Sequence, residues 1–213
     1  FVSGLQQSIT KPFGENIIQC NGTYYALSNQ RIPYRKDKTE DDRFFHLTLF
    51  GAANEIEAMK CYTEEVIRIQ LAVGLPPAHF GAQNKSFIRY FKDRDVIKFS
   101  YHGKPHSIYI EDVACFPQAY AAAVTVMESL IDSPKALVLD IGGFTADYLL
   151  MKYGQADLST CDSLENGVIL LYNRIRSKIN AELDLLLEES DIDAILKGQT
   201  DGYTEKAVRI VEY

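Results

Sequence analysis

One eight-residue segment holds the residues best suited to chemistry. It reads Asp140-Ile-Gly-Gly-Phe-Thr-Ala-Asp147 and stands between two apolar runs, ALVL and YLL. Glycines at a hairpin tip let backbone N–H groups approach an anion, because glycine has no Cβ in the way. Asp140 follows the first run, where a carboxylate suits a hydrated Mg²⁺. A plain hairpin with solvated aspartates is the alternative, but the full pattern between two apolar runs favours phosphate and metal binding.

Several other kinds of site are excluded by the sequence. It contains no Gly-x-Ser-x-Gly elbow, no Walker-type phosphate loop and no Cys-x-x-Cys pair. We therefore expect no zinc site, and free thiols in a reducing cytoplasm. The net charge of −7 argues against a chain whose main task is to grip nucleic acid. No apolar run approaches the ~18 residues of a membrane span.

The elements around the motif predict an α/β protein. Asn21-Gly22 lies between two strand-like runs, which predicts a β-hairpin over 16–28 because both turn positions need positive φ. Apolar spacings of three and four predict a helix over 45–59. The other expected elements are strands at 66–73, 96–101, 106–110, 113–116, 136–139 and 148–152, a loop at 74–77, and helices at 85–92, 118–130, 166–189 and 203–213.

These features together resemble the actin, heat-shock-chaperone and sugar-kinase ATPase superfamily, and within it the plasmid-segregation actin-like proteins of the ParM type. The resemblance rests on four stretches in the same order: NIIQCNGTYYALS, VIRIQLAVGLPPAHFG, YIEDVACFPQAYAAA, and LDIGGFTADYLLMKYGQA with SLENGVILLYNRI. It implies an actin-like ATPase fold with parts of two ribonuclease-H-like domains, mixed sheets flanked by helices, at 1–130 and 131–213. It also implies a fragment, since the first phosphate hairpin would precede Phe1 and the adenosine loop would follow Tyr213.

The resemblance also implies a role for individual residues. Gln118 would orient the attacking water, and Asp140 would be the acidic partner of a metal-bound water. The remaining positions would contact the nucleotide: Gly142, Gly143, Phe144 and Thr145 around the β- and γ-phosphates, Asp147 at the hairpin or the metal waters, and Glu165 and Gly167 near the nucleoside. Gln118 facing solvent and Glu165 simply starting a helix are the alternatives. The implied cofactors are ATP or GTP with Mg²⁺.

The function implied by the resemblance is that of a cytoplasmic ATPase that assembles into filaments and segregates plasmid or phage DNA. Such a protein would self-associate and engage DNA through an adaptor protein, without direct contact with nucleic acid or membrane. We expect the parent protein, rather than this fragment, to hydrolyse the nucleotide. Two alternatives stay open: a chaperone- or sugar-kinase-like ATPase that closes on a substrate, and a non-catalytic module that keeps the fold.

Overall fold

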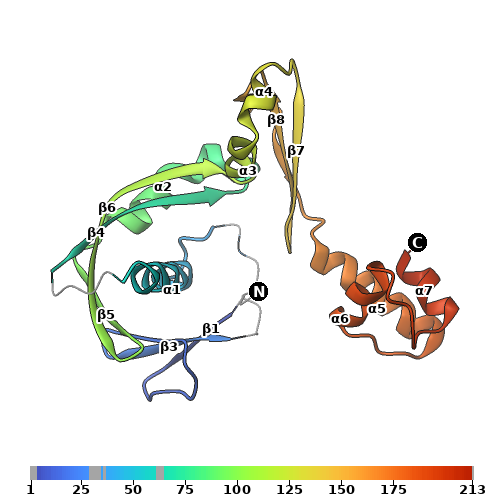
Figure 1. Ribbon diagram of the computed structural model, residues 1–213, viewed down its shortest axis with the longest axis horizontal. Helices are drawn as coiled ribbons and strands as arrows, with labels where there is room; N and C mark the ends of the chain where they lie inside the picture. The colour runs from blue at the N-terminus through green and yellow to red at the C-terminus, as the bar shows by residue number, and fades with distance from the viewer. Residues whose placement is uncertain (1–3, 29–34, 36, 61–64, 213) are drawn as a thin grey trace. The chain divides into compact units, whose positions relative to one another are not determined.

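The computed structural model describes residues 4–28, 35, 37–60 and 65–212, and the chain divides into two compact units (Figure 1). Unit 1 is Phe1–Pro117 and unit 2 is Gln118–Tyr213. The sequence predicted a boundary after residue 130 instead. Helix α3 (Tyr120–Thr125) belongs to unit 2 because its Ala123 is buried together with Leu149 and Met151. None of the described helices has the length and apolar character needed to cross a membrane.

Unit 1 is built on a six-stranded mixed sheet with the order β1-β3-β2-β5-β6-β4. Only β4 and β6 run parallel; the other neighbours are antiparallel. The strands are β1 (Gly4–Ser8), β2 (Ile17–Cys20), β3 (Thr23–Ser28), β4 (Ile67–Leu75), β5 (Ile97–Tyr101) and β6 (Lys104–Pro117).

Two helices, α1 (Arg43–Ala58) and α2 (Pro77–Lys92), share one core with the inward face of this sheet. Alternate residues of β5 point into the core, which is the period-two burial of a sheet with one covered face. The Tyr90 hydroxyl joins the helices: it accepts a hydrogen bond from the Phe45 amide at 2.9 Å and donates one to the Asp41 carbonyl at 2.8 Å.

Most predicted elements of unit 1 are present, with two differences. The Asn21-Gly22 turn is confirmed, with φ of 50° and 76°. Helix α2 begins at Pro77, where a loop was expected, because proline fits the first helical position, whose N–H needs no partner. The strands expected at 106–110 and 113–116 are one strand, β6, which passes an irregularity in its pairing with β4 opposite Ile69 and Gln70.

Unit 2 begins with two short helices, α3 and α4 (Met127–Ile131), in place of the single helix expected over 118–130. They pack on a small sheet with the order β10-β8-β7, to which β9 adds beside β8. Its strands are β7 (Ala136–Ile141), β8 (Ala146–Lys152), β9 (Gln155–Ala156) and β10 (Asp162–Leu164).

Helices α5 (Val168–Leu183), α6 (Glu189–Leu196) and α7 (Glu205–Glu212) complete unit 2 around a second core. The helix predicted over 166–189 ends earlier, because Asp184 takes a left-handed conformation with φ of 51°. A capping box between Glu188 and Asp191 then starts α6.

Candidate functional site

The eight-residue motif forms the turn between β7 and β8. The two strands pair antiparallel, with Asp140 opposite Asp147 and Ile141 opposite Ala146. The amide of Gly142 donates to the carbonyl of Thr145 at 2.8 Å and closes the turn. The predicted hairpin is therefore present, with its two glycines at the tip.

The two aspartates lie on the same face of the hairpin, because directly opposed residues in an antiparallel pair share a face. This is the face that packs against α3 and α4 through Leu149 and Met151. Asp147 is buried, and the Thr145 hydroxyl donates to its Oδ2 at 3.3 Å. Its Oδ1 is buried without a hydrogen-bond partner among the described residues. A buried carboxylate oxygen of this kind, beside a second carboxylate, suits a cation.

Helix α5 holds the hairpin tip from one side. The amides of Val168, Ile169 and Gly167 donate to the carbonyls of Gly142, Gly143 and Phe144 at 3.0, 2.9 and 3.0 Å, respectively. These amides are among those at a helix start that have no partner within the helix. The hairpin backbone therefore caps α5.

The same hydrogen bonds fix the direction of the tip amides. No cis peptide bond occurs among the described residues, and in a planar trans peptide the N–H points opposite to the preceding carbonyl. Because the carbonyls of 142–144 point at α5, the amides of 143–145 point away from it. Successive amides that point the same way form an anion-binding concavity.

Gln118 lies between the end of β6 and the start of α3, half-buried, and its side chain has no hydrogen-bond partner among the described residues. It stands two residues before the helix rather than at its first position. Ala119, the cap residue of α3, has φ of 69°, which is a costly conformation for a residue with a Cβ. Gln118 thus precedes a helix that packs on the hairpin face bearing both aspartates.

The two residues expected near the nucleoside lie between β10 and α5. Glu165 is exposed, whereas Gly167 is buried under the hairpin tip. A Cβ on Gly167 would overlap the carbonyl group of Gly143 and stand 2.5 Å from the carbonyl carbon of Phe144. Sequence reasoning did not foresee this steric role. A glycine in place of the usual Ser, Thr, Asp or Asn at a helix start was the available signal.

The described residues contain no group of three His, Cys, Asp or Glu side chains able to hold a metal ion by themselves. A cation at the hairpin would thus take its remaining ligands from phosphate oxygens and water, which is the usual arrangement for Mg²⁺. The thiols of Cys20, Cys115 and Cys161 are free, and burial raises the pKa of each. Cys61 lies outside the described residues.

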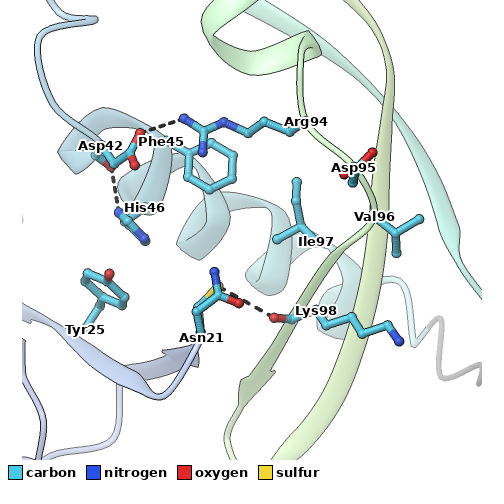
Figure 2. A pocket seen from close by; sticks show the side chains of 11 residues that line it. Asn21, Tyr25, Asp42, Phe45, His46, Arg94, Asp95, Val96, Ile97 and Lys98 are labelled. Atoms are coloured by element: carbon cyan, nitrogen blue, oxygen red, sulfur yellow. Dashed lines mark hydrogen bonds and ion pairs between the residues drawn. The ribbon is translucent and has the colours of Figure 1, made fainter.

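Unit 1 has a separate cavity of about 330 Å³ between α1, the β2–β3 turn and β5 (Figure 2). The Arg94 guanidinium lies 3.6 Å from the centre of the Phe45 ring and is 2.6 Å from a carboxylate oxygen of Asp42. His46 stacks on Tyr25 and bonds the Asp42 carbonyl through Nδ1 at 2.7 Å. Because these groups already satisfy one another, the cavity is not assigned to a ligand.

The fold is that of an α/β protein with a mixed sheet in unit 1 and an antiparallel sheet in unit 2. The family model described as the N-terminal domain of actin-like proteins matches residues 13–120, and the chain belongs to this family. The predicted fold class and resemblance are thereby confirmed. No curated protein matches the chain.

Solved structures of actin homologues share the fold. Ta0583, an archaeal actin homologue, superposes with a TM-score of 0.70 at 14% identity, over 97% of this chain and 69% of that one. A filament of AlfA from the B. subtilis plasmid pLS32 gives 0.57 at 11%, over 93% and 78%. The apo ParM protein of pSK41 gives 0.52 at 17%, over 87% and 65%. Across two structures of the archaeal homologue, the chain spans 63% and 69% of the homologue's length.

Proposed function

We propose that this chain supplies one phosphate-binding side of a nucleotide site in an actin-like ATPase. The proposal rests on one observation: three successive amides, those of 143–145, point away from α5 as a group. Phosphate oxygens are the ligand that such a concavity suits. A structure of the archaeal homologue Ta0583 is a complex with ADP.

The carboxylates beside this concavity fit a cation that accompanies the phosphates. Asp140 and the buried Asp147 would hold Mg²⁺ through oxygen or through its waters. When bound, Mg²⁺ neutralises charge on the phosphate oxygens. Gln118, whose amide can both donate and accept, would orient a water near the same face.

We also propose that the full-length protein forms filaments. These filaments would segregate plasmid or phage DNA through an adaptor protein. The AlfA structures are filaments, one of them bound to AMPPNP. A heterologous contact between copies, which does not close into a ring, produces a filament. ATP and GTP are both compatible with this proposal, because the tip would contact phosphate rather than base.

Sedimentation and light scattering of the full-length protein test this function. We expect a pelleting polymer with Mg²⁺ and ATP or GTP, and loss of that polymer after hydrolysis. A monomer whose turnover rises only with an added substrate would favour a chaperone-like or sugar-kinase-like ATPase. Failure to bind either nucleotide would favour the second alternative, a non-catalytic module that keeps the fold.

A further inference from the structure

The N-terminal turn of α5 touches the hairpin more closely than ordinary packing requires. Gly167 leaves no room for a Cβ, as its overlap with the Gly143 carbonyl group indicates. Its φ of −77° is accessible to any residue, so the need for glycine is steric rather than conformational. Ile169 adds a second contact, since its Cδ1 would be 3.1 Å from a Cβ on Gly143.

Helix α5 is in turn fixed to the rest of unit 2. Ile175 and Ile179 are buried in the core that α5 shares with α6 and α7. The Tyr172 hydroxyl also donates to the carboxylate of Asp193 on α6. The support beneath the hairpin tip is therefore a helix anchored in its own hydrophobic core.

We propose that the N-terminal turn of α5 positions the hairpin for phosphate, with Gly167 and the amide of Val168 as its positioning groups. This inference rests on the proposed nucleotide site. Each α5 amide that donates to a tip carbonyl orients the N–H on the other end of that peptide. It also polarises the peptide, since hydrogen bonds in a chain strengthen one another.

A matched pair of substitutions disrupts one of these contacts. In the full-length protein, Val168→Pro replaces the N–H that donates to Gly142 with a ring carbon, which removes the bond and pushes the Gly142 carbonyl away, whereas Val168→Ala keeps the bond. Proline is favoured at the first helical position, and Gly167, with ψ of 173°, already has the backbone that precedes a proline. Gly167→Ala is a second, independent variant. Gly81→Ala in α2 is its control, because a Cβ there meets no atom within 4 Å.

The measurement compares affinity for MgATP and MgGTP with affinity for adenosine and guanosine. We expect Val168→Pro to weaken triphosphate binding about tenfold or more relative to Val168→Ala, because it both loses a hydrogen bond and displaces the tip carbonyl. Gly167→Ala should weaken it by at least about tenfold. For Val168→Pro, nucleoside affinity should stay within about twofold, because a nucleoside has no phosphate for the hairpin.

Three results would contradict the inference in different ways. Equal triphosphate affinity in folded Val168→Pro and Val168→Ala would overturn it and leave the nucleotide site intact. A parallel loss of triphosphate and nucleoside affinity in Val168→Pro would also overturn it, since that indicates a general disturbance. If the wild-type protein binds none of the four compounds, the proposed function fails, and the inference fails with it.

Discussion

The opposed carboxylates of Asp140 and Asp147 repel each other unless a cation lies between them. Directly opposed like charges destabilise a sheet. Asp147 also carries a buried oxygen without a partner among the described residues. The pair thus lowers the stability of the empty site, which is the cost expected of residues kept for a ligand.

Asp140→Asn tests this interpretation. The substitution removes one of the opposed charges, so the unliganded protein should be as stable as wild type or more stable. Mg²⁺-dependent hydrolysis by the full-length protein should fall by about a hundredfold or more, the usual effect of losing an electrostatic catalytic group. Asp162→Asn, on the exposed strand β10, is the control and should hydrolyse normally. Normal turnover in Asp140→Asn would exclude a catalytic role.

Gln118→Ala tests mechanism rather than binding. Loss of a group that orients the attacking water should lower kcat by about ten- to a thousandfold, with little change in nucleotide affinity. Filaments should then assemble normally and disassemble late, as light scattering would report. Gln155→Ala, an exposed glutamine in β9, should match wild type. If Gln118→Ala hydrolyses at the normal rate, another group holds the water.

At the scale of elements, the sequence predicted those turns and strands whose own residues determine their conformation. Asn21-Gly22 defines its turn by backbone preference alone, and the β7–β8 hairpin is bounded by apolar runs on both sides. Strands β1 and β10 were not predicted, because each depends on pairing with a distant or neighbouring strand rather than on its own pattern. The close fit of Gly167 also needs the three-dimensional contact, since a glycine at a helix start does not by itself indicate which atoms it lies against.

Beneath α1, the sheet of unit 1 buries a histidine. His106 on β6 stacks on Phe99, and its Nε2 is buried without a partner among the described residues. Burial lowers the pKa of this imidazole; Glu57 opposes that shift and Lys104 adds to it. The pKa of His106 is therefore lower in the folded protein than in the unfolded chain. The folded state is fully stabilised above about pH 6.5, where the ring is neutral in both states, and it loses stability as the pH falls below that value and the unfolded chain takes up the proton.

Denaturation at pH 7 and pH 5 tests this buried histidine. Wild-type protein should lose stability between the two values, and His106→Phe, which keeps a ring against Phe99, should lose less. Part of the loss should remain, because burial also lowers the pKa of His46. The double variant His106→Phe with His46→Gln should lose still less stability between pH 7 and pH 5. Identical losses in wild type and His106→Phe would show that His106 is not the group that titrates.

At the scale of the whole molecule, the two units have separate hydrophobic cores. The core of unit 1 joins α1 and α2 to the six-stranded sheet. Unit 2 has one core among α5, α6 and α7 and another between α3, α4 and the small sheet. Separate cores allow each unit to open without the other.

Hydrogen exchange of the full-length protein measures this independence. Leu49→Ala in unit 1 and Ile192→Ala in unit 2 each remove a side chain that is 1% or less exposed. Each should destabilise its own unit by about 2–5 kcal/mol. Amides in the other unit should keep their wild-type exchange rates. Faster exchange throughout the chain in either variant would indicate one cooperative molecule.

Strand β6 has a mechanical consequence. It is a single strand of fourteen residues that begins at the β5–β6 turn and ends at Pro117, one residue before Gln118. An extended strand gives about 3.3 Å per residue, so it reaches roughly 45 Å. Strand β5 pairs with its first residues, 104–108, and β4 with the rest, 108–117, so a neighbouring strand supports it along its whole length. A push or pull at the far turn, such as a neighbouring subunit would exert, would be passed along this continuous strand to the residue beside Gln118. If the proposed function holds, strain in an assembly would thereby reach Gln118 without any loop having to move.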